Sequence, residues 1–204
     1  MLTISIHPQN PQQRLIDQAV SAVQRGAVIA YPTDSSYALA CQIGDVDALK
    51  RLRQLRGIDD KHHLTLVCAD LSEVSKYARV DNVQYRLLKR GTPGPYTFIL
   101  QASREVPRRL QHPKRSTIGL RVPAHPIVQS LLKTLGEPLL SCTFIHEGEA
   151  LFDPYTIAEG HYPLLDMLIE GGVCSEQTST IVDMSGDEPE LIRQGAGALS
   201  VLGL

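Results

Sequence analysis

The chain has 204 residues, of which 43% are hydrophobic and 21% are charged, and its formal net charge is −2. This composition excludes disordered, collagen-like and coiled-coil proteins, and it predicts an ordinary soluble globular protein with a sizeable core. No apolar run approaches the roughly 20 residues of a membrane span and the N-terminus lacks a secretory signal, so we expect a single cytoplasmic domain that covers residues 1–204.

The first half of the chain predicts strands that alternate with helices. Residues 2–7 alternate like a strand, and Asn10 with Pro11 then marks a helix start whose apolar repeat ends at Gly26. Residues 27–31 are wholly apolar, which favours a strand in a sheet covered on both faces. Further strands are expected at 37–43 and 64–68, and further helices at 46–56, 71–77 and 82–89.

The second half continues this alternation. Strands are expected at 96–100, 118–122, 139–143, 180–184 and 190–193, and helices at 127–135 and near 164–169. Strands and helices that alternate along the whole chain predict an α/β fold around one twisted, open sheet with helices on both faces. Because some strands follow one another as hairpins, the sheet should be mixed rather than fully parallel.

Basic residues are concentrated in residues 86–121, which hold nine basic side chains and one acid, a local charge of +8. From residue 137 onward there are twelve acids and one base, Arg193. The basic block favours a polyanionic partner such as nucleotide phosphates or RNA. Alternatively, it forms solvated faces that the acidic C-terminal third neutralises, and the sequence leaves both open. The candidate RNA-binding residues are Arg86, Lys89, Arg90, Arg104, Arg108, Arg109, Lys114 and Arg115.

The spacing of cysteine and histidine predicts no dedicated metal site. The four cysteines lie far apart without a C-x-x-C pair, which is typical of buried thiols in a reducing compartment, and the seven histidines lack metal-ligand spacing. The P-loop pattern and G-x-G-x-x-G are also missing. Any phosphate must therefore be held by another arrangement.

Three polar clusters lie at the ends of predicted strands. They are Tyr-Pro-Thr-Asp-Ser-Ser-Tyr at 31–37, Ser-Cys-Thr at 141–143, and Thr-Ser-Thr at 178–180 with Arg-Gln-Gly-Ala-Gly at 193–197. Open α/β sheets bind ligands beyond the carboxyl ends of strands, where hydroxyls and free backbone N–H groups converge. Taken alone, each cluster is more often a turn or a helix cap.

Short motifs occur in a fixed order along the chain: Tyr-Pro-Thr-Asp at 31–34, Leu-Arg-Gly at 55–57, Pro-Gly-Pro-Tyr-Thr-Phe at 93–98, Ile-Gly-Leu-Arg-Val-Pro at 118–123 with His-Pro at 125–126, Gly-Glu-Pro-Leu-Leu-Ser at 136–141, Ser-Thr-Ile-Val-Asp at 179–183 and Arg-Gln-Gly at 193–195. Their order and spacing resemble the YrdC-like family, and within it the YciO branch, over nearly the whole chain. The resemblance implies a twisted open α/β sheet with a large concave cavity. For the well-studied branch it implies synthesis of threonylcarbamoyl-AMP from L-threonine, bicarbonate and ATP, with release of pyrophosphate, for the threonylcarbamoyladenosine modification of tRNA.

The resemblance also implies roles for individual residues. Threonine would be bound by Thr33, Arg121 and Ser179, and Arg121 suits the substrate carboxylate because a guanidinium pairs with it through two parallel hydrogen bonds. The implied ATP-binding residues are Arg56, Thr117, Ser141, Thr143 and Arg193. Of these, Arg56 and Arg193 are the catalytic cations that would stabilise charge on the phosphates. ATP enters as a substrate with Mg²⁺, and neither a tightly bound cofactor nor a metal site formed by the protein is expected.

Several positions depart from the family pattern. Asp34 shortens the acidic residue of the first motif, and Ile145 replaces an asparagine. Active members carry a Lys-x-Arg pair after the second helix, and Arg56 and Ile58 stand at its two places here. Lys61 in the same loop is a candidate replacement, although two adjacent aspartates oppose phosphate binding. Because one preorganised donor is commonly worth roughly 10²–10³ in rate, these losses predict weak or altered activity.

Two functions of different classes follow from the sequence. The leading expectation is a threonylcarbamoyl-AMP synthase-like nucleotidyltransferase that acts on ATP, L-threonine and bicarbonate. The alternative is a non-catalytic protein whose concave face binds tRNA or double-stranded RNA through the basic block, and nucleotide hydrolysis or sensing in the same cavity is a third reading. The enzymatic expectation requires that Arg56, Arg121 and Arg193 converge on one pocket.

Overall fold

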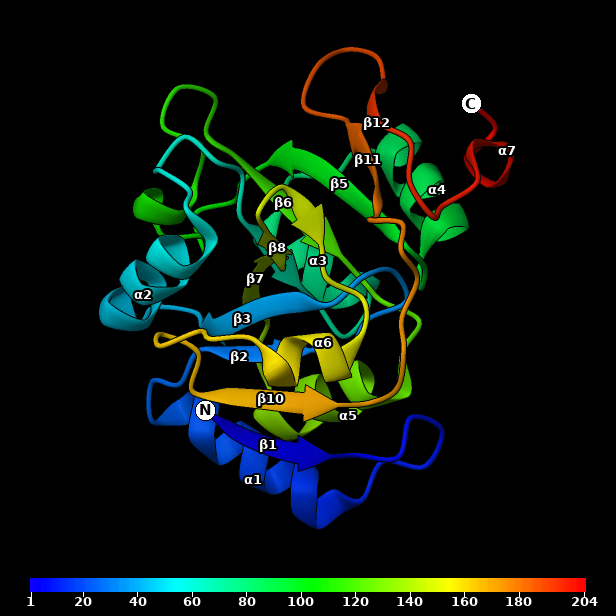
Figure 1. Cartoon of the computed structure of the whole chain (residues 1–204). Helices are drawn as coiled ribbons and strands as arrows, with labels where there is room; N and C mark the ends of the chain where they lie inside the picture. Colours follow the sequence, from blue (N-terminus) through cyan, green and yellow to red (C-terminus); the bar gives the residue numbers. More distant parts are fainter.

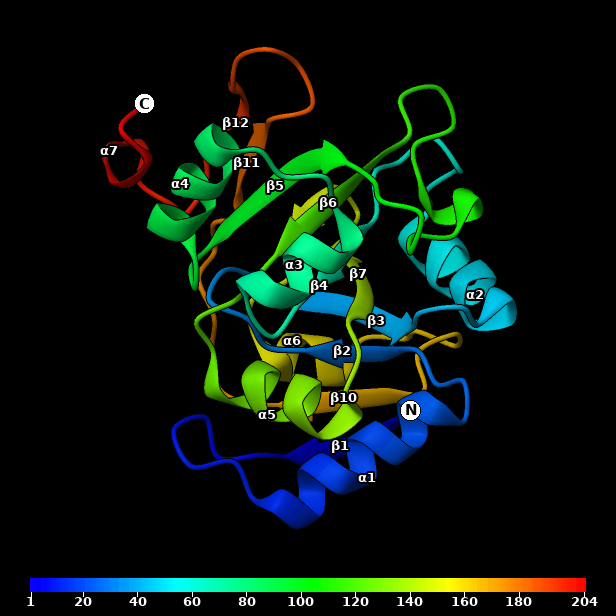
Figure 2. The same cartoon turned by 180° about the vertical axis from the view of Figure 1, so that it is seen from behind.

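The computed structural model describes residues 1–204 and contains one large sheet that runs through the whole molecule (Figure 1, Figure 2). Its strands are β1 (Leu2–Ser5), β2 (Ile29–Tyr31), β3 (Ala38–Gln42), β4 (Thr65–Val67), β5 (Tyr96–Gln101), β6 (Thr117–Arg121), β7 (Leu139–Thr143), β10 (Met167–Glu170), β11 (Thr180–Asp183) and β12 (Glu190–Arg193). They lie in the order β1-β10-β2-β3-β7-β4-β6-β5-β11-β12. A separate two-stranded sheet pairs β8 (Ile145–His146) with β9 (Glu149–Ala150).

The sheet is mixed, which confirms the prediction from the hairpin connections. Strand β10 is parallel to both β1 and β2, and β4–β6 and β5–β11 are parallel pairs. The pairs β2–β3, β3–β7, β4–β7, β5–β6 and β11–β12 are antiparallel. The hydroxyl-rich segment at 32–37 is the turn of the β2–β3 hairpin, so the tight connection fixes its position at the end of β2.

Helices cover both faces of the sheet, as predicted. They are α1 (Gln13–Gln24), α2 (Val46–Arg56), α3 (Leu71–Tyr77), α4 (Asn82–Gly91), α5 (Pro126–Leu135), α6 (Pro154–Glu159), α7 (Leu199–Leu202) and the short 3₁₀ helix η1 (Arg108–Leu110). Helices α1 and α5 bury their apolar sides in a cluster of 19 residues, together with β10, β2 and β3. The remaining α-helices pack into a larger cluster of 34 residues on the opposite face, which we call the larger core.

Local signals placed most of these helices. Asp70 and Asp81 cap α3 and α4 as expected, because their carboxylates accept from backbone N–H groups in the first turn. Helix α1 differs at its start: the residue before its first turn is Gln12, not Asn10, and no side chain caps it. The apolar stripe of α1 therefore stabilises it through packing rather than through a cap.

The helix expected near 164–169 is wrong. Residues Met167–Glu170 form strand β10, which pairs with β1 on one side and β2 on the other. A short, largely apolar run fits a buried strand as well as a buried helix, so periodicity could not decide between them. The helix of this region is α6, which Asp153 caps and Pro154 begins, a start signal that the expectation overlooked.

Alternation along the central strands places polar side chains on the face of the sheet opposite the larger core. Leu66, Leu120 and Phe98 lie in register on neighbouring strands and belong to the larger core. Thr65 and Thr97, which alternate with such residues, face the other side of the sheet. The helices of that side, α1 and α5, pack mainly under β10, β2 and β3 (Figure 2). The sheet beyond them is free to form a ligand site.

Candidate active site

The turn after β2 buries three side-chain hydroxyls. Thr33, Ser35 and Ser36 are all at most 3% exposed. The Thr33 hydroxyl donates to the Ser36 carbonyl at 2.7 Å, and its oxygen accepts from the Ser35 backbone N–H at 3.0 Å. These bonds close the turn on itself and hold Thr33 at the carboxyl end of a buried strand, where ligands of open sheets bind.

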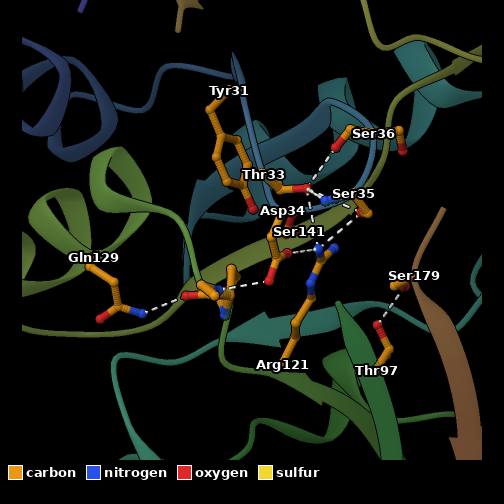
Figure 3. Close-up of polar contacts among 12 residues, drawn as sticks. Tyr31, Thr33, Asp34, Ser35, Ser36, Thr97, Arg121, Gln129, Ser141 and Ser179 are labelled. Carbon is orange, nitrogen blue, oxygen red and sulfur yellow. Dashed lines mark hydrogen bonds and ion pairs between the residues drawn. The ribbon is translucent and has the colours of Figure 1, made fainter. Parts of the chain in front are cut away.

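Arg121 ends β6 and reaches into this turn (Figure 3). Its Nη2 donates to Thr33 Oγ1 at 3.2 Å and to Ser35 Oγ at 2.9 Å, and it forms an ion pair with the Asp34 carboxylate. The other oxygen of Asp34 accepts from the Ala124 N–H at 2.7 Å. Arg121 Nε is buried without any partner. An unpaired buried donor is costly, so this atom marks a polar group that the closed turn leaves unsatisfied.

A polar cavity of about 290 Å³ lies beside this group. Its lining contains three cations, Arg56, Lys61 and Arg193, and no carboxylate. Predicted residues Thr143 and Ser179 also line it. An uncompensated positive charge in a hollow concentrates anions, so the cavity is suited to phosphate groups.

The two expected catalytic cations are held at the cavity by backbone carbonyls. Arg56 is the last residue of α2, and its Nε donates to the Thr143 carbonyl at 3.0 Å. Arg193 is the last residue of β12, and its Nε and Nη2 donate to the Ser179 carbonyl at 3.3 Å and 2.9 Å. These bonds use part of each guanidinium, which leaves other N–H groups available to an anion.

Electrostatics links the cavity to the Arg121 turn. Burial lowers the pKa of Arg193, and the positive charge of Arg121 lowers it further. Arg121 therefore lies close enough to Arg193 for its charge to disfavour the protonated form of Arg193. Burial also lowers the pKa of His62, which lines the cavity, and the charge of Arg56 adds to that effect. Of the three arginines that the enzymatic expectation requires, Arg56 and Arg193 line the cavity, whereas Arg121 lies in the turn outside its lining.

Three predicted hydroxyl residues differ in their exposure to the cavity. The Ser179 hydroxyl hydrogen-bonds the Thr97 hydroxyl at 2.9 Å, and both residues line the cavity (Figure 3). Thr117 is fully buried and hydrogen-bonds His63 Nε2 at 3.0 Å, so it contacts the cavity through that histidine. Ser141 donates to the Leu39 carbonyl and hydrogen-bonds the Tyr31 hydroxyl, each at 2.8 Å. Neither Thr117 nor Ser141 lines the cavity.

The departures from the family pattern also separate in space. Ile145 and Lys61 line the cavity. Ile58 instead packs partly buried against the larger core and lines a different surface cavity beside α2. An arginine at position 58 would therefore start from a side chain that packs away from the phosphate region.

Sequence reasoning missed part of the lining. The sequence assigns no role to His62 and His63, yet both line the cavity. Ser35 was part of the hydroxyl-rich turn but was given no role, and it bonds Arg121. Thr97 lay within the Pro-Gly-Pro-Tyr-Thr-Phe motif, so a signal for it was present in the sequence.

The basic block does not form one surface. Its first part lies on α4 beside α7, where Arg90 donates to the Leu202 carbonyl. The rest lies in the β5–β6 connection beside α2, on the other side of the molecule in both views (Figure 1, Figure 2). Arg115 is paired with Asp183 at 2.6 Å, and Arg121 is buried in its own ion pair. RNA binding by the whole block stays a prediction.

No group of three or more histidine, cysteine, aspartate or glutamate side chains could hold a metal ion. None of the helices has the length and apolar character to span a bilayer.

The fold and this site together define the class of protein. Residues 21–195 match the model of the Sua5/YciO/YrdC family, which is described as telomere recombination. The chain belongs to this family, as the motif resemblance predicted.

Individual relatives and solved structures show which members of the family the chain resembles. The chain is 50% identical to the uncharacterized protein YciO of Escherichia coli (strain K12), over 94% of each chain. It is 30% identical to the threonylcarbamoyl-AMP synthase of Homo sapiens, over 82% of this chain and 62% of that one. Among solved structures, E. coli YciO superposes with a TM-score of 0.95 at 48% identity, covering 99% of this chain and 100% of the other. P. abyssi Sua5 complexed with L-threonine gives 0.90 at 26% identity, covering 100% and 61%.

Proposed function

We propose that this protein binds L-threonine and ATP in the described site and forms threonylcarbamoyl-AMP from them and bicarbonate, with low activity. The proposal extends to a role in the threonylcarbamoyladenosine modification of tRNA. It is supported by the family membership and by the threonine complex of P. abyssi Sua5, a protein of the same fold.

One observation carries the proposal. Arg121 presents a buried Nε without a partner, beside the hydroxyls of Thr33 and Ser35, and its charge acts on Arg193 at the cationic cavity. A carboxylate held by Arg121 would leave the rest of an amino acid to extend toward the cavity. The cavity in turn would take the phosphates of ATP between Arg56 and Arg193.

The chemistry requires positioning and charge stabilisation rather than a covalent intermediate. The amine of threonine attacks the carbon of bicarbonate, water leaves, and a carbamate forms. A carbamate oxygen then attacks the α-phosphorus of ATP, and pyrophosphate departs. Arg56 and Arg193 would stabilise the charge that develops on the phosphates, and Mg²⁺ would arrive bound to ATP.

The cavity also supplies a reason for low activity. Ile145 presents an apolar side chain where the family pattern has an amide. An apolar group cannot donate to a phosphate or ribose, so part of the transition-state stabilisation is missing. The aspartates next to Lys61 further weaken the positive field at that side.

Direct binding measurements test the proposal. Calorimetric titration of threonine and of ATP with Mg²⁺ should each give saturable binding, and the two ligands together should raise the melting temperature. Arg193→Ala should abolish ATP binding and the rise in melting temperature that ATP causes. Arg121→Lys should mainly weaken the binding of threonine. Arg86→Ala, which removes an exposed arginine of α4, is the matched control and should change neither. Absence of binding for both ligands at millimolar concentration would exclude this function.

A further inference from the structure

A second cavity, of about 720 Å³, lies apart from the site described above. It is bounded by the segment that follows α3 and by the β5–β6 connection. Arg79, Arg104 and Arg108 line it, and its lining contains no carboxylate. None of these three side chains forms an ion pair within the chain, because the ion pairs present involve other arginines. Three exposed guanidinium groups thus face one hollow without a counter-charge.

Backbone hydrogen bonds hold the two walls of this cavity together. The Ser103 N–H donates to the Tyr77 carbonyl, and the Arg79 N–H donates to the Gln101 carbonyl, each at 2.9 Å. Val106 is 1% exposed and anchors the β5–β6 connection in the larger core. The convergence of the three arginines is therefore set by paired backbone and not by a free loop.

Ser116 adds an independent observation at the same cavity. It lines the hollow with a φ of 53°, in the left-handed region that a residue with a Cβ rarely adopts. Hydrogen bonds hold it there: its N–H donates to the His112 carbonyl at 2.9 Å, and its carbonyl accepts from the Ala102 N–H at 3.0 Å. Strain of this kind concentrates at ligand sites.

We propose that this cavity binds a phosphate ester. Three guanidinium groups match the double charge and three oxygens of a phosphate better than the single charge of a carboxylate. A volume of about 720 Å³ also leaves room for the organic part, since small-molecule sites span roughly 300–1,000 Å³. The phosphate belongs either to a free nucleotide, whose monoester carries the double charge, or to the backbone of RNA, where several singly charged phosphodiesters would share the three guanidinium groups.

A histidine pair connects this cavity to the first one. The rings of His63 and His112 stack with centroids 4.6 Å apart, and His63 lines the first cavity while His112 lines the second. An anion in the second cavity therefore changes the field at His112 directly. The imidazole resonances of His112 report on this cavity when phosphate binding in the first cavity has been weakened.

The test uses the full chain with Arg56→Ala and Arg193→Ala, so that phosphate binding in the first cavity is weakened. AMP, inorganic phosphate and a short RNA are titrated separately by calorimetry, and the His112 resonances are followed by NMR. We expect saturable binding that shifts the His112 signals. Arg104→Ala or Arg108→Ala, added to this background, should lower the affinity by about tenfold or more, as for a lost charge-assisted hydrogen bond.

The outcomes separate the two sources of the phosphate and the two sites. Binding of AMP identifies a free nucleotide, and binding of RNA alone identifies a phosphodiester backbone. Arg86→Ala is the matched control and should leave the affinity unchanged. The proposal is overturned if no probe binds, or if Arg86→Ala weakens binding as much as Arg104→Ala does. Threonine and ATP binding to the unmutated protein is measured separately, so this result stands apart from that of the proposed function.

Discussion

Arg56 and Thr143 lie 87 positions apart in the sequence and are joined by a hydrogen bond of 3.0 Å between Arg56 Nε and the Thr143 carbonyl oxygen. The bond ties the end of α2 to the end of β7. An arginine at a helix terminus usually extends into solvent, whereas this one is held at the wall of the cavity. Arg56 thus lines the cavity, whereas the side chain at position 58 lies outside its lining.

The buried Arg121–Asp34 pair should matter for stability as well as for binding. Arg121→Ala leaves the Asp34 carboxylate, whose side chain is 11% exposed, without its counter-charge. We expect a loss of about 3–5 kcal/mol in the free energy of unfolding, measured with urea. Arg51→Ala is the matched control: its partner Asp166 is 44% exposed, so the loss should stay below about 1 kcal/mol. Equal losses would contradict the buried-pair interpretation.

Ile145→Asn should raise the activity of the protein. It returns an amide to the cavity wall, and one such donor is worth up to roughly 10²–10³ in rate. Pyrophosphate release that depends on threonine and bicarbonate measures the gain. The sequence alone suggested that Ile58→Arg would add to this effect, but Ile58 packs against the larger core, so we expect that change to cost stability without a gain in rate. A folded double variant that is faster than Ile145→Asn would contradict this assignment.

Gly195→Ala should disturb the strand end that carries Arg193. A Cβ at position 195 would lie 2.1 Å from the Thr178 carbonyl oxygen, and the Gly195 N–H already donates to Thr180 Oγ1 at 2.9 Å. We expect a loss of about 1–3 kcal/mol in unfolding free energy and weaker ATP binding. Gly186→Ala, where nothing lies within 4 Å, should have little effect on either quantity. Wild-type ATP affinity in folded Gly195→Ala would show that Arg193 does not depend on this contact.

Stability should fall in mild acid. Burial lowers the pKa of His63, with His112 and Arg115 adding to the effect, and burial also lowers the pKa of His125. The unfolded chain then binds more protons than the folded one, so this contribution is complete above the unfolded pKa of about 6.5 and is lost as the pH falls. Urea unfolding at about pH 7 and pH 5 measures the loss.

Variants identify the histidine responsible. His63→Gln should flatten the pH dependence of the unfolding free energy between these two conditions. His161→Gln, at an exposed position, should leave it unchanged. A protein that becomes more stable as the pH falls through this range would contradict the assignment.

RNA binding, if it occurs, should depend on the β5–β6 connection. Three phosphate contacts from this segment would give a log–log salt slope of about −2 for a single strand. Charge reversal of Arg108 and Arg109 should weaken binding without regard to RNA sequence. The same reversal at Arg86 and Lys89 on α4 is the control and should have the smaller effect. A slope near zero would show that the connection makes no phosphate contacts.

The sequence by itself determined the elements whose signals are local. Helix α2 forms at its predicted bounds, and the structure shows local signals at both ends: an aspartate caps its first turn and Gly57 in the left-handed conformation ends it. The mixed sheet and the polar clusters at strand ends followed in the same way. The order and spacing of short motifs were enough to indicate the family, because the motifs lie in or next to the strands and helices of its fold.

Only the tertiary structure decided which of these residues meet. Strand order across the sheet brings Arg121 to the turn after β2 and Arg193 to the cavity, and no local pattern encodes that order. The same order turns Ile58 toward the larger core and separates the basic block into two surfaces. Met167–Glu170 shows the limit of local reasoning. A short, largely apolar segment can be buried as a helix or as a strand, and here it is a strand because it pairs with β1 on one side and β2 on the other.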